Sequence, residues 1–194
     1  MKPDAETLRH VKADLRASAL ARRDGLDPAF RAVASAQVAA LALPLFRGLS
    51  AGTVVAGFFP MRSEIDPRPL MQALVGEGFS LALPCVSKEG LVFRHWTYGD
   101  PLAKRRFGLS EPLDRAALVT PCAFIVPLAA FDRRGHRIGY GAGHYDRALA
   151  QAPDVLKIGI GFAAQEVPAV PDETHDQALD AVVTEEGVVR PPRT

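Results

Sequence analysis

The apolar residues near the start of the chain recur with the period of a helix. Over residues 4–22 they fall every three or four positions, at Leu8, Val11, Leu15 and Ala19. This spacing predicts an amphipathic helix. Lys12 and Arg16 are four residues apart, so we expect both on one face of this helix.

Further helices are predicted from the residues that begin them. Asp27 precedes Pro28, and Asp66 precedes Pro67. An aspartate at the N-cap followed by a proline at the first helical position is typical of a helix start. A fourth, short helix is predicted after Gly143, with its apolar residues turned inward.

Short apolar runs bounded by glycine, proline or polar residues predict buried strands between these helices. The runs cover residues 52–60, 79–86, 91–96, 123–131, 156–162 and 181–189. Strands that alternate with helices predict an α/β fold, here a single Rossmann-like, three-layer α/β/α domain around a mixed, mostly parallel sheet. We expect this domain to span residues 1–190, with residues 191–194 as a tail. Ligands of such sheets bind beyond the carboxyl ends of the strands.

Composition and charge narrow the functional classes. The 194 residues carry a formal net charge of +1, which argues against broad binding to nucleic acid. No continuous apolar run approaches the roughly 18 residues of a membrane span, and the charged N-terminus lacks the apolar core of a signal peptide. We therefore predict a cytoplasmic monomer that acts on a small molecule, without a nucleic-acid or membrane partner.

The two cysteines do not indicate a metal or redox site. Cys85 and Cys122 are far apart in the sequence and form no C-x-x-C motif. We expect both to be buried thiols, because unpaired cysteines commonly pack as small hydrophobic residues.

The most informative stretch is FDRRGHRIGYGAGHYDRALA, residues 131–150, which joins a predicted strand to a predicted helix. Glycines allow positive φ and close approach of a ligand to the backbone. N–H groups at a helix start attract phosphate, and Arg137 and Arg147 could add charge-assisted contacts. The pattern predicts a polyphosphate site. The spacing excludes a P-loop and a dinucleotide fingerprint, because G-K-[ST] and the third glycine of G-x-G-x-x-G are missing. A plain glycine turn is the structural alternative.

Two carboxylates could share a divalent ion with such a phosphate. Asp146 follows the glycines, and Asp176 lies in VPDETHDQALD, after the strand predicted at 156–162. Mg²⁺ prefers one or two carboxylates together with phosphate and water oxygens. Each aspartate alone is more simply a helix cap or a surface charge. His175 beside Asp176 lacks the further histidines of a metal-dependent phosphohydrolase.

With these residues assembled, the chain resembles the 5-formyltetrahydrofolate cyclo-ligase family over nearly its whole length. The strongest match is PLAAFDRRGHRIGYGAGHYDRAL, and weaker ones follow in the family's order: KADLR, FFPMRSEID, GLSEP and THDQALDAVVTEEG. The resemblance implies a fold similar to the sugar-phosphate isomerase/CoA-transferase-like superfamily. It also implies cyclisation of 5-formyltetrahydrofolate to 5,10-methenyltetrahydrofolate with ATP and Mg²⁺, releasing ADP and phosphate.

The resemblance further implies roles for individual residues. ATP would be bound by Lys12, Arg16, Arg137, Gly139, Tyr140, Gly141, Ala142, Gly143, His144, Tyr145 and Asp146. The folate would contact Phe59, Glu64, Trp96, Tyr140 and His144. The metal would be held by Asp146 and Asp176, and Glu64 and Arg147 would take part in catalysis.

Two positions depart from the family pattern, and two other functions stay open. Ala142 stands where glycine or lysine is common, so it offers no side-chain contact to phosphate, and His144 replaces the usual tyrosine. One alternative is another phosphate-handling α/β enzyme, such as a sugar-phosphate isomerase relative, which would not require the pair Lys12 and Arg16. The other is a non-catalytic nucleotide- or folate-binding regulatory module, which should bind without turnover.

Overall fold

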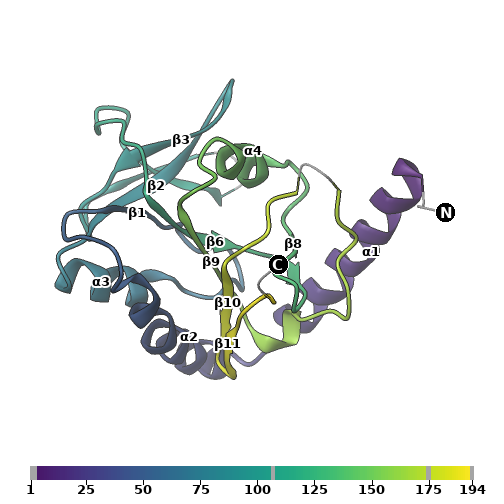
Figure 1. The fold of residues 1–194 in the computed structure, drawn as a ribbon. Helices are drawn as coiled ribbons and strands as arrows, with labels where there is room; N and C mark the ends of the chain where they lie inside the picture. Colours follow the sequence, from purple (N-terminus) through teal and green to yellow (C-terminus); the bar gives the residue numbers. More distant parts are fainter. Residues whose placement is uncertain (1–3, 106–107, 174–175, 193–194) are drawn as a thin grey trace.

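A seven-stranded mixed sheet forms the middle of the molecule (Figure 1). The computed structural model describes residues 4–105, 108–173 and 176–192. The sheet has the order β11-β10-β9-β6-β1-β2-β3. Its strands are β1 (Val54–Ala56), β2 (Ser80–Ser87), β3 (Gly90–His95), β6 (Ala123–Pro127), β9 (Leu156–Ile160), β10 (Ala181–Thr184) and β11 (Gly187–Val189). The five inner strands are parallel and the two edge strands antiparallel, which confirms the predicted α/β fold with a mixed, mostly parallel sheet.

The remaining elements surround this sheet. The helices are α1 (Ala5–Asp24), α2 (Pro28–Ala42), α3 (Arg68–Gly76) and α4 (His144–Ala150), with short 3-10 turns η1 (Leu43–Phe46) and η3 (Ala163–Gln165). Two small antiparallel sheets pair β4 (Leu102–Lys104) with β5 (Ser110–Pro112), and β7 (Ala130–Phe131) with β8 (Arg137–Ile138). The sequence pattern did not predict β4, β5 or β8, because strands of two or three residues carry too little periodicity.

Helices cover both faces of the central sheet. On one face α2 and α3 lie side by side, and Val38 and Leu74 pack in one cluster with Leu81 of β2 (Figure 1). On the other face Leu149 of α4 packs in a second cluster with Phe124 of β6. Each central strand therefore buries apolar side chains on both sides, as expected for a parallel sheet.

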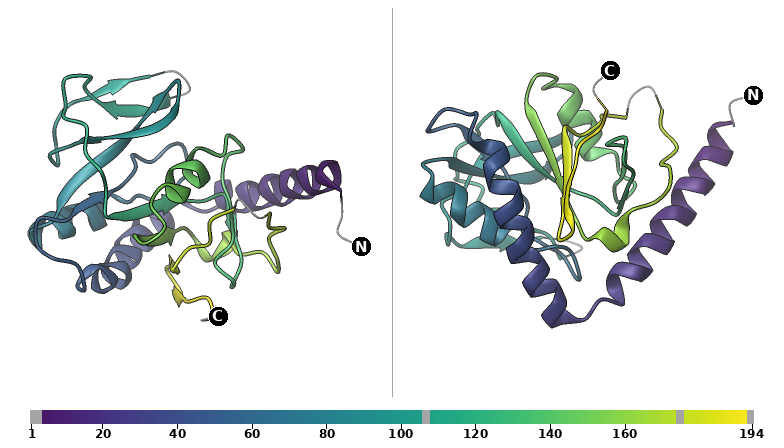
Figure 2. Two further views of the ribbon diagram at one scale, coloured as in Figure 1. Left: turned by 45° about the horizontal axis from the view of Figure 1, so that its top comes forward. Right: turned by 60° about the horizontal axis from the view of Figure 1, so that its bottom comes forward.

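The first helix stands apart from these layers. Both views of Figure 2 show that α1 extends outward, with its N-terminal end away from the rest of the chain. Its C-terminal half contacts the body near β7 and η3, where Ala19 is fully buried in a cluster with Val167 and Val170. The outer half of α1 is thus free to present its polar side chains to a neighbouring cavity.

Two predicted strands are each divided. The run at 123–131 ends as β6 and resumes as β7, which leaves the sheet to pair with β8. Gln165 supports the break, because its Nε2 donates to Ala129 O at 3.0 Å. The run at 181–189 is a hairpin of β10 and β11, since Gly187, with φ of +146°, lets the chain reverse. Apolar residues continue across both breaks, so hydrophobicity alone did not reveal them.

One predicted helix start is confirmed and one is wrong by a residue. Asp27 caps α2, and its Oδ1 accepts a hydrogen bond from Ala29 N at 2.8 Å. The helix after Asp66 instead begins at Arg68, with Pro67 as the N-cap. Asp66 accepts bonds from the Arg68 backbone N–H and guanidinium, so it still stabilises the same turn.

The expectation that both cysteines are buried is wrong for one of them. Cys85 is buried, but Cys122 is exposed because it lies just before β6, outside the sheet.

The helical stretch Pro28–Phe46 is long and apolar enough to pass for a membrane span by length and composition. It packs on α3 and the sheet through residues such as Val38, so we interpret it as a core helix, a class that passes the same test.

Candidate functional site: two cavities beside a glycine loop

The glycine loop, residues 139–143, connects β8 to α4. Gly141 and Gly143 have φ of +101° and +62°, a region that favours glycine. From α1, Arg16 holds the loop in place, because its Nε donates to Gly139 O at 2.7 Å. The loop has a cavity on each side of it, and the two cavities differ in character.

The first cavity, of about 470 Å³, is polar, and we call it the cationic cavity. It lies between α1, the glycine loop, the start of α4 and the segment around Asp176. Its charged lining residues are Arg9, Lys12, Arg16, Arg137, Asp146, Arg147, Glu173 and Asp176. Among the described residues, five cations against three carboxylates give this lining a net positive charge, which suits a polyphosphate.

The charges of the cationic cavity are largely paired with one another. Lys12 Nζ lies 2.7 Å from Asp176 Oδ2 and 3.0 Å from Glu173 Oε2. Burial alone lowers the pKa of Lys12, but the two carboxylates outweigh it and hold this pKa above its ordinary value. The buried Arg137 donates its Nη2 to Asp146 Oδ1 at 2.8 Å. An incoming phosphate would therefore exchange partners with groups that are already charged and in position.

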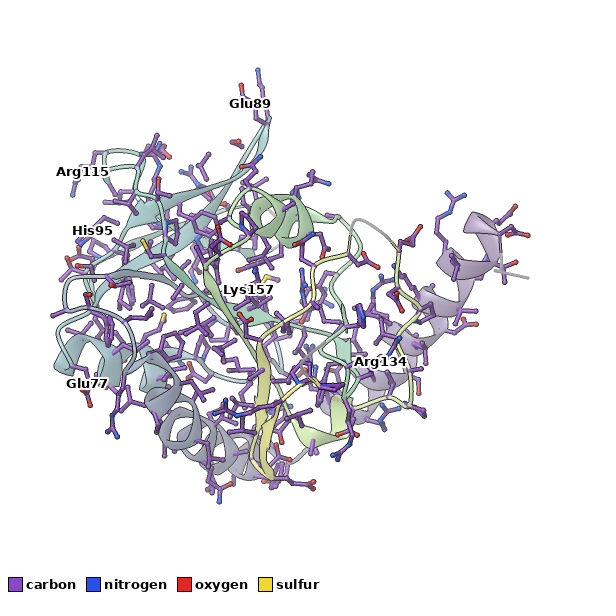
Figure 3. The ribbon with its side chains drawn as sticks, in the orientation of Figure 1. Glu77, Glu89, His95, Arg115, Arg134 and Lys157 are labelled. Carbon is purple, nitrogen blue, oxygen red and sulfur yellow. The ribbon has the colours of Figure 1, made fainter. Side chains whose placement is uncertain are left out.

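A buried carboxylate outside the cavity fixes the segment that carries Glu173 and Asp176. Asp132 is only 1 % exposed and accepts hydrogen bonds from Arg134 Nη2 and Val170 N, both at 2.8 Å. Arg134, labelled in Figure 3, also donates to Val170 O at 2.7 Å. The turn between β7 and β8 thereby holds this segment beside the polar face of α1.

The two carboxylates expected to hold magnesium both line the cationic cavity. Asp146 lies in the first turn of α4, and Asp176 reaches the cavity from the opposite wall. Two carboxylates leave most of an octahedral shell to phosphate and water oxygens, which suits Mg²⁺. Across the described part of the chain, no three His, Cys, Asp or Glu residues form a complete cage. The donor set thus fits a cation that arrives with a phosphate; His175 lies outside the described residues.

The second cavity, of about 410 Å³, lies on the other side of the glycine loop, and we call it the aromatic cavity. Its apolar and aromatic lining includes Phe58, Phe59, Met61, Pro84, Val86, Leu91, Leu109, Tyr140 and Tyr145. Arg137, Gly139, Gly143 and Asp146 line both cavities, so the two cavities adjoin at these residues. An apolar pocket with a few fixed polar groups is typical of a small-molecule site.

Glu64 is a carboxylate held by fixed donors in the aromatic cavity. Its Oε2 accepts a hydrogen bond from Met61 N at 2.8 Å, and its Oε1 accepts one from the Tyr140 hydroxyl. Burial raises the pKa of Glu64, while the bonds from Tyr140 and Met61 and the charge of Arg23 hold the rise in check. Burial and the Glu64 carboxylate also raise the pKa of Tyr140, which therefore keeps its proton.

The first turn of α4 contributes side chains to both cavities. His144 lines the aromatic cavity, and its Nδ1 lies 3.0 Å from Nη2 of Arg147, which lines the cationic one. Because a guanidinium only donates, His144 Nδ1 acts as the acceptor. Ala142 adds only a methyl group to the aromatic cavity. The buried hydroxyl of Tyr145 has no hydrogen-bond partner among the residues that the structure describes.

Trp96, expected to line the folate pocket, is not part of the aromatic cavity. It is 5 % exposed, and its Nε1 donates to Asp100 O at 3.1 Å. Strand β3 runs antiparallel to β2, so its end lies beside the start of β2 rather than at the carboxyl ends of the parallel strands. Trp96 instead lines a third cavity, of about 370 Å³, which shares Phe59 and Ser110 with the aromatic cavity.

Four charged residues among those described at or beside this site were not selected from the sequence: Arg9, Arg23, Glu111 and Glu173. Arg23 lies seven positions after Arg16, two helical turns along the same face of α1, so helical spacing could have found it. Glu111 and Glu173 belong to the motifs GLSEP and VPDETHDQALD, so these motifs were the signal that could have found them.

A family model matches most of the chain. The model described as the 5-formyltetrahydrofolate cyclo-ligase family matches residues 8–185. The chain is 31 % identical over 134 residues to 5-formyltetrahydrofolate cyclo-ligase of Haemophilus influenzae, covering 64 % of this chain and 72 % of the relative. It is 34 % identical over 139 residues to the enzyme of the same name from Escherichia coli K12, covering 67 % and 76 %.

Solved structures have the same fold. A structure of Aquifex aeolicus 5,10-methenyltetrahydrofolate synthetase superposes with a TM-score of 0.80 at 30 % identity and covers 95 % of both chains. A structure of the Mycoplasma pneumoniae protein of that name has a TM-score of 0.72 at 19 % identity, covering 90 % of this chain and 98 % of the other. The second likeness concerns the fold alone.

Proposed function

The chain belongs to the 5-formyltetrahydrofolate cyclo-ligase family, and we propose that its two cavities hold the two substrates of that reaction. The activity is the ATP-dependent conversion of 5-formyltetrahydrofolate to 5,10-methenyltetrahydrofolate. The cationic cavity would take the triphosphate of ATP, and the aromatic cavity the reduced pterin. The observation that carries this proposal is that the two cavities adjoin, because Arg137, Gly139, Gly143 and Asp146 line both of them.

Adjoining cavities suit a phosphoryl transfer from one ligand to the other, because the two reacting groups can meet where the cavities adjoin. The formyl group is amide-like and a poor electrophile, so it needs activation. Its oxygen would attack the γ-phosphorus of ATP, and the bond to ADP would break, leaving an iminium phosphate. N10 of the same folate would then bond to the formyl carbon and lose its proton while phosphate leaves. Closing a ring within one molecule requires no protein nucleophile, only correct positioning.

The cations of the first cavity would stabilise the transferring group. Lys12, Arg16 and Arg137 would contact phosphate oxygens, and positioning with charge stabilisation is most of what a protein supplies in phosphoryl transfer. Mg²⁺ held by Asp146 and Asp176 would neutralise further charge on the triphosphate. The exposed backbone of the glycine loop lets the nucleotide approach closely.

The second cavity would orient the folate. Phe59 and Tyr140 offer aromatic surfaces to the pterin, and Glu64 offers a fixed acceptor for a ring N–H or for the N10 proton. His144, which accepts from Arg147, would place that guanidinium at the boundary between the two ligands. Arg147 would thereby act on the γ-phosphoryl group as it passes from ATP to the folate.

The direct test is turnover. Purified protein is incubated with 5-formyltetrahydrofolate, ATP and Mg²⁺, and the absorbance of methenyl-folate is followed. We expect product only when all three are present. A regulatory module would bind ATP or folate without forming product, and a sugar-phosphate isomerase relative would act on its own substrate without ATP. Absence of product from protein shown by circular dichroism to be folded would reject the proposal.

We also propose that the protein works as a monomer, because the described residues of one chain line both cavities. A cytoplasmic location stays a prediction from the sequence. Size-exclusion chromatography with light scattering should give a mass near the 20.8 kDa of one chain. A mass of twice that value at assay concentration would contradict the monomer.

A further inference from the structure

Arg23 is a buried cation that lines neither cavity. Its side chain is 3 % exposed, although the carboxylate nearest to it, that of Asp24, lies 3.4 Å away and is more than half exposed. A buried guanidinium is costly unless its donors are bonded. Two of those donors go to hydroxyls, with Nε to Ser63 Oγ at 3.0 Å and Nη1 to Tyr140 OH at 2.6 Å, and Nη2 donates to Asp24 Oδ1 at 3.4 Å.

The hydrogen bond from Arg23 to Tyr140 determines which way the hydrogen bond between Tyr140 and Glu64 runs. A guanidinium has donors only, so the Tyr140 oxygen must accept from Arg23. The Tyr140 proton is then directed to Glu64 Oε1, while Met61 N–H donates to Glu64 Oε2. Both oxygens of Glu64 therefore accept a hydrogen bond from a neighbour, an arrangement that matches a carboxylate and not a carboxylic acid.

The same bonds connect three elements of the site. Arg23 belongs to α1, which also carries Lys12 and Arg16 of the cationic cavity. Tyr140 belongs to the glycine loop, and Glu64 lies in the segment between β1 and α3. A change at Arg23 would thus reach the loop and the carboxylate together.

We infer, on the basis of the function proposed above, that Arg23 is a positioning residue of the reaction: through the Tyr140 hydroxyl it keeps the Glu64 carboxylate charged and oriented toward the folate, and it ties the glycine loop to that carboxylate. Arg23 acts only through Tyr140 and Ser63, and it touches neither substrate.

The charges around Glu64 give this inference a measurable consequence. The groups that face Glu64 are Tyr140 from the loop, Arg23 from α1 and Tyr145 from α4, besides the Met61 N–H. Burial already raises the pKa of Glu64, and Arg23 opposes that rise. Removing the cation should therefore raise this pKa further, so that Glu64 becomes protonated at a higher pH.

The test compares Arg23→Met and Arg23→Lys with Arg22→Met in the cyclisation assay from pH 5.5 to 9. Arg22 is a matched control, since it is the next residue of α1 and donates to Ala164 O, away from both cavities. We expect Arg23→Met to move the acid limb of kcat/KM for the folate to higher pH. On the acid limb the loss should approach tenfold for each unit by which the pKa rises, and it should shrink toward pH 9.

Two further variants separate positioning from mere folding. Arg23→Lys keeps the charge and should recover most of the pH profile, and Arg22→Met should match the wild type. Tyr140→Phe deletes the bridging oxygen and should shift the acid limb in the same direction. Combined with Arg23→Met, it should add little, because the two groups act in one chain of bonds. If Arg23→Met fails to fold, Tyr140→Phe carries the test alone.

The outcomes are distinct. An unchanged profile in Arg23→Met, or an equal loss at every pH, overturns the inference, because a purely structural role would not depend on the charge of Glu64. Wild-type protein that forms no product would reject the proposed function instead. In that case the pH dependence of 5-formyltetrahydrofolate binding, followed by tyrosine and tryptophan fluorescence, still tests Arg23: a shift in the binding profile supports the inference, and parallel profiles overturn it.

Discussion

The two cavities that meet at the glycine loop hold their polar groups in different ways. In the cationic cavity, side-chain charges pair with one another, as Lys12 does with Asp176 at 2.7 Å. In the aromatic cavity, carboxylates are held by fixed donors: Glu64 by Met61 N, and Glu111 by Val86 N at 2.9 Å. Charged side chains that pair with one another can exchange these partners for the oxygens of a charged ligand, whereas a carboxylate that loses a backbone donor is destabilised. The first cavity is therefore suited to rearrange around a charged ligand, and the second to present a fixed surface.

The largest expected effect on turnover comes from Asp146, the carboxylate that lines both cavities. Asp146→Ala removes a proposed metal ligand and leaves the buried Arg137 without its 2.8 Å partner. We expect turnover to fall on the order of 10²–10³-fold, as when a transition-state charge contact is lost. Steady-state kinetics over a range of Mg²⁺ concentrations checks this. Asp154→Ala, an exposed acid just after α4, is the control and should behave as wild type. Unchanged rates in Asp146→Ala would remove that residue from the metal site.

A backbone change in the loop should have a smaller effect that falls mainly on ATP. Gly141 has φ of +101°, and a Cβ there would lie 3.8 Å from Arg16 Nη2. Gly141→Ala should strain the loop by about 1–2 kcal/mol and raise KM for ATP about tenfold. Gly52→Ala carries a similar strain, at φ of +81°, in open space outside the lining of both cavities. Equal KM values for ATP in the two variants would show that the loop does not hold the nucleotide.

Salt should separate the two cavities. A site that binds through exposed charges is screened by ions, and an apolar one much less. Between 0.05 and 0.5 M NaCl we expect KM for ATP to rise several-fold, about 3- to 10-fold, and KM for the folate to rise less. Initial rates with one substrate saturating measure each value. A larger rise for the folate would reverse the assignment of the cavities.

The smallest expected effect is on the stability of the fold and concerns the buried hydroxyl of Tyr145. The Tyr145 hydroxyl has no partner in the described part of the chain, and burial raises the pKa of Tyr145. Tyr145→Phe should therefore stabilise the fold by about 1 kcal/mol and raise Tm by about 2–4 °C. Thermal unfolding of ligand-free protein checks this, and a lower Tm would mean that the hydroxyl has a partner in solution.

The sequence predicted the parts of the site that depend on local chemistry. The glycines of the loop need positive φ, and Lys12 and Arg16 share a helical face, so spacing and residue type sufficed for both. The cap at Asp27 and the alternation of helices with strands likewise depend on neighbours in the chain.

The parts it missed depend on contacts between distant segments. Arg23 and Tyr140 are 117 residues apart, and the residues around each of them in the sequence do not predict their hydrogen bond. Trp96 lines the third cavity and not the aromatic one, because strand direction follows from pairing and not from the strand's own residues. The division of the run at 123–131 depends on Gln165, which bonds the carbonyls at the break.

The central claim is that the triphosphate and the pterin bind in adjoining cavities and meet at the residues that line both. A crystal structure of the protein with 5-formyltetrahydrofolate, a non-hydrolysable ATP analogue and Mg²⁺ tests it most directly. The account predicts the γ-phosphate in the cationic cavity against Gly139–Gly143, with the formyl oxygen facing it from the aromatic cavity. A nucleotide bound elsewhere, with the glycine loop open to solvent, would contradict it.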